Sequence, residues 1–390
     1  MQETKDIGLR GIPVADTKIC AIDGEKGKLI YRGYDIDELA QYSSFEETVY
    51  LLLYETLPTK KELDIFREEL ASERKLPPGI IRHLKKRKKT ANPMDVLQSV
   101  IPMLADFDSE ARAGTKGAVI RQSLRLVSRM STLVAYWDRI RKDLEIIKPD
   151  ESLGHAANFL YMINAELPDE KTTRDFDICL ILHAEHSFNA STFAARVAAS
   201  TRAHIYACVG AALAALSGEL HGGANTQVMN MLFEIDDIDK VDKWIGSKLD
   251  ANEIIMGMGH AVYKTMDPRA KILSEISERL VKRTGVSKWY ELSHKIETSV
   301  RQEFKKRKGK EIYPNVDFYS PSVYYLMGID PDLFTSIFAV SRISGWCAHI
   351  IEEKFAEAQP KPALYRPEAD YIGNYCGVEE CKYVSIEERK

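Results

Sequence analysis

Two histidines stand next to glycines in segments that read as loops. His221 lies within SGELHGGAN, after a helix end at Gly218, and His260 directly follows the Gly-Met-Gly of residues 257–259. Glycine lets the backbone approach a ligand closely, and loops often carry the groups that bind or react. Since a lone histidine is more often structural, each of the two is open to a structural or a catalytic interpretation.

Two arginines occupy positions where a positive charge is costly without a partner. Arg269 lies in the first turn after Asp267-Pro268, a pair that predicts a helix start, where the helix dipole is positive. Arg342 interrupts the apolar helical stretch LFTSIFAVSRISGW. If Arg269 points outward and Arg342 forms an internal ion pair, neither needs a ligand. The alternative is a pocket in which these arginines bind an anion such as a carboxylate.

An aspartate with apolar and aromatic neighbours adds a possible base. Asp317 lies in YPNVDFYSP. If it is buried without a cation its pKa rises, which suits a general base acting on a weakly acidic proton. A helix-capping aspartate is the structural alternative. His183 and His186 have a spacing that metal ligands use, but the sequence offers no convincing third ligand, so we predict no metal site.

Composition limits the classes of protein and partner. The chain has 390 residues, of which 45% are hydrophobic, and this length predicts two domains. A net charge of −4 argues against nucleic acid as the main partner. Six scattered cysteines without a CxxC pair predict reduced thiols in a cytoplasmic protein, and Cys376 and Cys381 are the closest of them. The polar N-terminus resembles neither a signal nor a transit peptide.

The elements that must position these residues are predicted to be helices almost throughout. The one clear strand signal is a hairpin around residues 23–27. Capping pairs predict helix starts at Ser44 and Thr59, and Asp or Ser before Pro predicts starts at 267, 320 and 330. A further helix is expected from about 224 to 234, followed by a charged stretch, and the last long helix ends near 354. We therefore predict an all-α protein of fifteen to twenty helices.

Several segments, taken together and in this order, resemble the citrate synthase family in its compact dimeric form. They extend from residue 22 to residue 373 and are IDGEKGKLIYRGYDIDELA, HAANFLYM, AEHSFNAST, GELHGGAN, MGMGHAVYKTMDPRA, NVDFYS, FAVSRISGW and YRPEADYIG. The resemblance implies a mostly helical homodimer with two domains in each subunit. The larger would comprise residues 1–222 plus 328–390, and the smaller, residues 223–327, would close over the substrates.

The resemblance also implies a reaction, the condensation of acetyl-CoA with oxaloacetate and water to give citrate and CoA, without a cofactor. Asp317 would remove a proton from the acetyl methyl group. His221 would donate a hydrogen bond to the thioester oxygen, and His260 would polarise the oxaloacetate carbonyl. A second set of residues would bind the substrates: His186, Arg269, Arg342 and the other subunit's Arg366 for oxaloacetate, and Lys264, Gly257 and Gly259 for CoA.

Two other functions fit the same segments. A 2-methylcitrate synthase would use propionyl-CoA, and a non-catalytic homologue would bind CoA or a dicarboxylate without turnover. Because His221, His260 and Asp317 are all present, we favour the enzyme. The chain departs from the commonest family pattern at Ser187, Glu219, Ala261 and Pro321. Of these, Glu219 and Pro321 could alter loop geometry and with it the choice of acyl-CoA.

Overall fold

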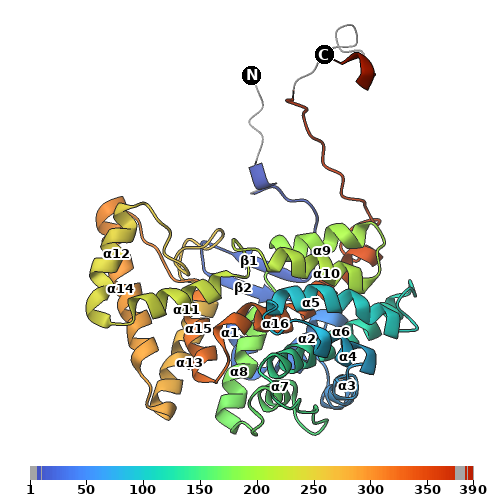
Figure 1. Ribbon diagram of the computed structural model, residues 1–390, viewed down its shortest axis with the longest axis horizontal. Helices are drawn as coiled ribbons and strands as arrows, with labels where there is room; N and C mark the ends of the chain where they lie inside the picture. The colour runs from blue at the N-terminus through green and yellow to red at the C-terminus, as the bar shows by residue number, and fades with distance from the viewer. Residues whose placement is uncertain (1–6, 10, 374–382, 384, 390) are drawn as a thin grey trace.

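A computed structural model describes residues 7–9, 11–373, 383 and 385–389. Over these residues, sixteen α-helices and one small antiparallel sheet form the regular structure, apart from short 3-10 turns. The predicted all-α class with an N-terminal hairpin is confirmed (Figure 1). Cys376 and Cys381 lie outside the described residues.

The sheet lies at the start of the chain and comprises β1 (Cys20–Asp23), β2 (Lys28–Tyr31) and β3 (Tyr34–Asp35). In the predicted hairpin, Cys20 pairs with Tyr31 and Asp23 with Lys28. The Asp23 carboxylate accepts a hydrogen bond from the Lys26 N–H at 3.0 Å, which closes the turn. The buried Tyr31 hydroxyl donates to the Glu185 carbonyl at 2.8 Å, and so fixes the sheet against a distant helical corner.

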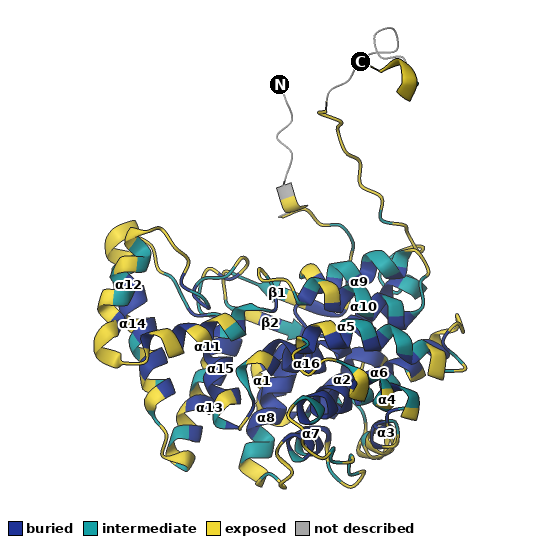
Figure 2. Ribbon diagram, viewed as in Figure 1, coloured by how far each residue is buried: buried dark blue, intermediate teal, exposed yellow. Residues whose placement is uncertain are grey.

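Most helices pack around one central apolar helix, α16 (Phe334–Phe355), which is buried from Phe334 to Glu353 (Figure 2). Among the described residues, Pro331–Phe355 is the one stretch whose length and apolar composition would allow it to cross a membrane, and its most apolar 18 residues are all buried inside the protein. The helices of this group are α1 (Ile36–Tyr42), α2 (Phe45–Tyr54), α3 (Lys60–Ser72), α4 (Pro78–Lys86), α5 (Pro93–Met103), α6 (Lys116–Arg141), α7 (His155–Asn164), α8 (Glu170–His183), α9 (Ala190–Ser200) and α10 (Ile205–Leu216).

The remaining five helices pack mainly on one another. Figure 1 shows them together on the left, in yellow and orange, with the central helix and its neighbours on the right. They are α11 (Ala224–Ile235), α12 (Val241–Asp250), α13 (Pro268–Thr284), α14 (Lys288–Lys308) and α15 (Val316–Leu326).

Side-chain caps fix several of the predicted helix starts. Thr59 and Glu62 form a complete capping box at α3, Ser44 accepts from the Glu47 N–H at α2, and Asp267 accepts from the Arg269 N–H at α13. A side-chain oxygen in this place satisfies an N–H that the helix itself leaves unpaired. The basic runs 85–89 and 305–310 lie at the C-terminal ends of α4 and α14, where cations complement the helix dipole.

One predicted helix start is wrong, and some helices, α12 among them, were not located from the sequence. Ser320-Pro321 does not begin a helix: α15 starts at Val316 with Asn315 as its cap, and the buried Pro321 lies inside it. Proline removes one hydrogen bond within a helix, here to the Asp317 carbonyl, and the packing of α15 against α11 and α13 tolerates this loss. The charged stretch after α11 contains the start of α12, whose buried face consists of Val241 and Ile245.

Candidate active site

A cleft of about 760 Å³ lies where the two groups of helices meet, within the range of small-molecule sites. Its walls come from β1, the corner between α8 and α9, the corner between α10 and α11, the segment 259–262, the N-terminal turns of α13 and α15, and the middle of α16. Most of the predicted site residues line it: His186, His221, Gly259, His260, Arg269, Asp317 and Arg342.

Backbone N–H groups determine which ring nitrogen of His260 carries the proton. His260 Nδ1 accepts hydrogen bonds from the Val262 N–H at 2.9 Å and the Tyr263 N–H at 3.2 Å. A ring nitrogen that accepts carries no proton, so the neutral ring is protonated at Nε2. Burial, assisted by the charge of Arg269, lowers the pKa of His260 to about 4. His260 is therefore a neutral donor at physiological pH.

His221 carries its proton on the other ring nitrogen. Its Nε2 atom accepts a hydrogen bond from the Ser191 N–H at 3.3 Å and lies 2.8 Å from the Ser191 hydroxyl. The neutral ring is therefore protonated at Nδ1. Burial, assisted by the charge of Arg342, lowers the pKa of His221 to about 4. The two histidines thus supply two neutral N–H donors to one cleft.

A third histidine, His186, is close to both His260 and Tyr263. The ring centroids of His186 and His260 are 5.3 Å apart, and His186 Nε2 lies 3.2 Å from the Tyr263 hydroxyl. Burial holds the pKa of His186 well below its usual value, and the charge of Arg269 adds to the effect. Tyr263 was not predicted as a site residue, because its contact with His186 joins segments that are far apart in sequence.

Asp317 is an acid without a partner for one of its oxygens. It lies in the first turn of α15, where Asn315 caps the helix and accepts the Asp317 N–H at 2.9 Å. The alternative that Asp317 itself caps the helix is therefore wrong. Its Oδ1 atom is buried without a hydrogen-bond partner. Burial raises the pKa of Asp317 from 3.8 to about 6, despite the charges of Arg269 and Arg342.

The two arginines are both buried, but they are compensated differently. Arg269 forms a bidentate pair with Asp267, at 3.0 Å from Nε and 2.7 Å from Nη2. Burial alone would lower the pKa of Arg269, but the Asp267 carboxylate outweighs it and raises the pKa. Arg342 donates from Nε to the His183 carbonyl at 2.6 Å, and burial lowers its pKa. No described carboxylate lies within 4 Å of its guanidinium, so the predicted alternative of an internal ion pair is not found.

The Gly-Met-Gly segment before His260 is held by hydrogen bonds to the residues before α15. The Asn315 N–H donates to the Gly257 carbonyl at 2.9 Å, and the Asn315 side chain donates to the Gly259 carbonyl at 2.8 Å. Both glycines have positive φ, 77° and 84°. A Cβ on Gly257 would lie 2.9 Å from side-chain atoms of Val228 and Phe318. Asn315, which was not predicted, thus ties His260 to the helix that carries Asp317.

Three predicted site residues do not line the cleft of this chain. Gly257 is enclosed by packing, as described above. The Lys264 side chain is 74% exposed and forms an ion pair with Glu25. Arg366 is exposed in the C-terminal tail, which Figure 1 shows leaving the body of the protein beyond α16.

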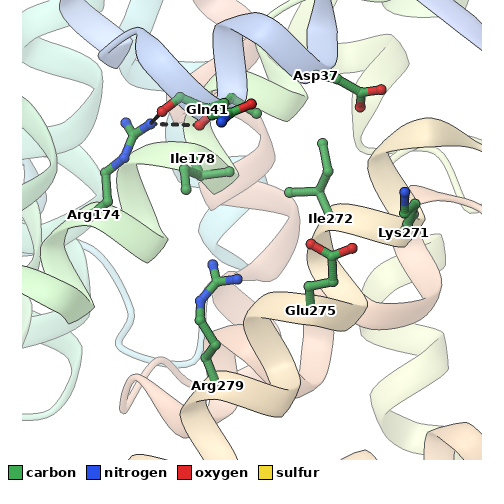
Figure 3. Close-up of a pocket in the computed structure, with 9 residues that line it drawn as sticks. Asp37, Gln41, Arg174, Ile178, Lys271, Ile272, Glu275 and Arg279 are labelled. Carbon is green, nitrogen blue, oxygen red and sulfur yellow. Dashed lines mark hydrogen bonds between the residues drawn. The ribbon is translucent and has the colours of Figure 1, made fainter.

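A second cleft, of about 450 Å³, lies between α1, α8 and α13 (Figure 3). Its two arginines already have partners within the chain: Arg174 donates to the carbonyls of Ala40 and Gln41 at 2.6 and 3.0 Å, and Arg279 pairs with Asp175 at 2.8 Å. It contains no histidine. It therefore lacks the neutral imidazole donors of the first cleft, and its two carboxylates, Asp37 and Glu275, are exposed, unlike Asp317.

The first cleft combines a base, two neutral donors and two cations. A carboxylate with a pKa near 6 is a better base than an ordinary aspartate, and fixed donors stabilise an oxyanion that forms during a reaction. Buried guanidinium groups bind carboxylates of a ligand. This set suits removal of a proton next to a carbonyl group, followed by reaction with an anionic partner.

Comparisons with known proteins agree with this chemistry. Residues 8–368 match the family described as "Citrate synthase, C-terminal domain". The chain is 47% identical over 383 residues to "Citrate synthase 2" of Bacillus subtilis, covering 98% of each protein. It is 38% identical over 387 residues to "2-methylcitrate synthase 1" of Corynebacterium glutamicum, again covering 98% of each.

A solved structure gives the same result for the fold. The citrate synthase of Thermoplasma acidophilum, in a ternary complex with carboxymethyl coenzyme A and oxaloacetate, superposes with a TM-score of 0.90 at 34% identity, covering 98% of each chain. Together with the sequence matches, this likeness along nearly the whole length assigns the chain to a family of enzymes. The chain belongs to the citrate synthase family.

Proposed function

We propose that this enzyme condenses acetyl-CoA with oxaloacetate and water to give citrate and CoA. The observation that carries the proposal is the combination of Asp317, with an unpartnered oxygen and a pKa of about 6, and two neutral histidines whose N–H groups are fixed by backbone contacts. The ligands of the Thermoplasma acidophilum structure, oxaloacetate and a CoA analogue, support this choice of substrates.

In the first step Asp317 removes a proton from the methyl group of acetyl-CoA. A thioester α-proton is too weakly acidic for an unaided carboxylate. The His221 Nδ1–H donates to the thioester oxygen as negative charge develops there, and such a donor typically stabilises the transition state by about 3–4 kcal/mol. The raised pKa of Asp317 strengthens the base in the same step.

In the second step the enol carbon attacks the ketone of oxaloacetate. The His260 Nε2–H polarises that carbonyl, while His186, Arg269 and Arg342 hold the two carboxylates. Water then hydrolyses the citryl thioester and releases CoA. Proton transfer, carbon–carbon bond formation and hydrolysis involve no change that a redox cofactor or a metal would have to supply.

The arrangement of domains and subunits belongs to the same proposal. Residues 223–327 form a smaller domain that closes over the substrates, against residues 1–222 plus 328–390. Lys264, Gly257 and Gly259 lie near CoA in the closed state, and the partner of a homodimer contributes its Arg366 to the oxaloacetate site. The exposed position of Arg366 on a tail that leaves its own subunit supports this role. A cytoplasmic location is part of the proposal and rests on composition.

Release of thiol from acetyl-CoA in the presence of oxaloacetate tests the proposed reaction. We expect release that depends on both substrates, and an enzyme that releases none would contradict the proposal.

Parallel kinetics with propionyl-CoA test the alternative of a 2-methylcitrate synthase, which the relative from Corynebacterium glutamicum keeps open. The two substrates differ by one methyl group, worth about 1–3 kcal/mol of discrimination. A strong preference for propionyl-CoA would replace the proposed function with that alternative.

Mixed subunits test the shared site. Arg366→Ala and Arg269→Ala each remove one oxaloacetate ligand, and each variant alone should bind oxaloacetate weakly. A hybrid dimer has one cleft that combines Arg269 of one subunit with Arg366 of the other. Mixing the two variants should therefore restore activity, and a mixture without recovery would contradict a site shared between subunits.

A further inference from the structure

The C-terminal tail is fixed to the protein one residue before Arg366. Of residues 361–373, Tyr365 is the one that is half-buried, whereas the others are exposed. Its hydroxyl donates to Glu353 Oε2 at 2.9 Å, its ring meets Phe193 edge-on at 5.5 Å, and its N–H donates to the Ser200 hydroxyl at 3.4 Å. Tyr365 thus contacts both α9 and the end of α16. In Figure 1 the tail runs away from the body beyond this region.

The acceptor of the Tyr365 hydroxyl belongs to a group of charged residues inside the protein. We call this group the buried ion cluster: Glu185, Arg196, His349, Glu352 and Glu353. Arg196 on α9 lies 2.6 Å from Glu352 and 2.8 Å from Glu353, both on α16. These residues are between 0% and 5% exposed. Charges buried this deeply are tolerated only in a well-defined geometry, so Glu353 is a rigid acceptor.

The buried ion cluster extends to the wall of the cleft. Arg196 Nη1 lies 3.0 Å from His349 Nδ1, and His349 Nε2 lies 2.9 Å from Glu185 Oε1. Because the arginine can only donate, His349 accepts at Nδ1 and donates from Nε2 to Glu185. Glu185 immediately precedes His186 of the cleft. Tyr365 is therefore fixed to the same framework that positions one of the oxaloacetate ligands.

We propose that Tyr365 is a positioning residue that sets where the tail leaves the subunit and so directs Arg366 into the partner's cleft. The inference rests on the proposed role of Arg366. Without this contact, the chain from the end of α16 to Arg366 would have to be ordered each time oxaloacetate binds. Fixing the neighbouring residue in advance removes much of that entropy cost. The effect should fall on oxaloacetate binding and leave the chemical step intact.

Graded variants of Tyr365 provide the first test. Tyr365→Phe keeps the ring on Phe193 but loses the hydroxyl, and we expect the KM for oxaloacetate to rise roughly tenfold, as for loss of a hydrogen bond to a charged group. Tyr365→Ala should raise it further, and kcat should change less than twofold in both. Tyr42→Phe, the same change at a tyrosine that is 77% exposed, should leave both constants unchanged. An oxaloacetate KM within twofold of wild type in Tyr365→Ala would overturn the inference.

Hybrid dimers distinguish an effect on the partner from damage within the same subunit. Tyr365→Ala subunits are mixed with an excess of Asp317→Asn subunits, which have an intact tail but lack the base. In a hybrid, the working cleft belongs to the Tyr365→Ala subunit and receives the intact tail. We expect this cleft to bind oxaloacetate with the wild-type KM. A KM that stays raised in the hybrid would show that Tyr365 acts on its own subunit and would overturn the inference.

The same assays separate this inference from the proposed function. Arg366→Ala should also raise the KM for oxaloacetate and should recover in the hybrid with Asp317→Asn. If Arg366→Ala has no effect, the proposed role of Arg366 is wrong. If Arg366→Ala has its effect and Tyr365→Ala has none, only the positioning role of Tyr365 is wrong.

Discussion

The cleft and the buried ion cluster contain the same kinds of residue, histidine, arginine and carboxylate, but differ in how these residues are paired. In the buried ion cluster Arg196 lies within 2.8 Å of two carboxylates, and His349 donates to a third at 2.9 Å. In the cleft, Asp317 Oδ1 has no partner and no described carboxylate pairs with Arg342. The charges of the buried ion cluster are paired with one another, although Glu185 Oε2 also lacks a hydrogen-bond partner. In the cleft Arg269 is paired with Asp267, but Asp317 and Arg342 have no such ion partner among the described residues.

This difference separates a structural role from a functional one more clearly than residue type does. An uncompensated buried charge raises the free energy of the unliganded protein, and it is retained where a ligand or a reaction uses it. The carboxylates of oxaloacetate would supply what Arg342 lacks. The buried ion cluster needs no ligand, so its residues should affect folding and tail placement before they affect chemistry.

The largest effect is expected from removing the base of the cleft. Asp317→Asn should reduce kcat by roughly 10³-fold or more, within the range for a lost general base. Oxaloacetate binding, measured by calorimetry, should persist. The melting temperature should stay unchanged or rise slightly, because the substitution removes a buried charge without a partner.

The matched control is Asp37→Asn in the second cleft, the same change in the pocket without histidines. It should leave kcat and KM unaltered. Near-normal turnover in Asp317→Asn would show that another group is the base, and a large loss in Asp37→Asn would show that such changes act through the fold.

The next largest effect should appear in stability and not in turnover. Arg196→Met leaves Glu352 and Glu353 buried without their cation, and breaking a buried ion pair in this way typically costs about 3–5 kcal/mol. Urea denaturation of the wild-type and variant proteins measures this loss. Adding Glu352→Gln and Glu353→Gln to the variant should recover a substantial part of it.

The matched change at the other buried arginine tests the comparison directly. Arg342→Met leaves no paired carboxylate behind, only the His183 carbonyl without its donor. Its loss of stability should therefore be about 1–3 kcal/mol, smaller than that of Arg196→Met, while oxaloacetate binding weakens strongly. Equal destabilisation by the two substitutions would contradict the distinction between the buried ion cluster and the cleft.

Local signals in the sequence predicted much of the fold. The helix starts at Thr59 and Asp267 depend on side chains within three residues of the start, so their signal is complete in a short stretch. The helix start predicted at Pro321 is wrong because its deciding signals lie outside the short stretch around it. A proline normally marks a helix start, but here Asn315 caps the helix six residues earlier, and tertiary packing holds Pro321 inside it.

The site was predictable only in part. The sequence pointed to His221, His260 and Asp317, and the resemblance gave them roles, but neither could give their protonation states. Those states depend on Ser191 and on the N–H groups after His260. The contact between His221 and Ser191 joins loops that come together only in the folded chain. No periodicity or motif carries that information.

A smaller effect on rate is expected from removing one neutral donor. His221→Ala loses the proposed Nδ1–H donor, and kcat should fall by roughly 10²–10³-fold with little change in oxaloacetate binding. Ser191→Ala is the matched control, since the Ser191 N–H remains and still fixes the ring. It should reduce kcat by less than tenfold. An equal loss in both variants would mean that the hydroxyl, and not the backbone, fixes the tautomer of His221.

The smallest effect is a pH dependence set by Asp317. The base must be ionised, and burial raises its pKa to about 6, so kcat/KM should rise about tenfold per pH unit below pH 6 and level off above it. His221 and His260, with pKa values of about 4, stay neutral over that range.

The stability of the folded protein should change with pH in the direction opposite to the rate. The folded state holds the proton of Asp317 more tightly than the unfolded state, so the wild type should lose stability relative to Asp317→Asn as pH rises from about 4 to about 6. A rate profile from pH 4.5 to 8, with denaturation of both proteins across the same range, measures both trends. If the rise of kcat/KM with pH is instead centred near 3.8, the ordinary pKa of an aspartate, then Asp317 is compensated by its surroundings. In that case Asp317, the main residue of the contrast with the buried ion cluster, would no longer support it.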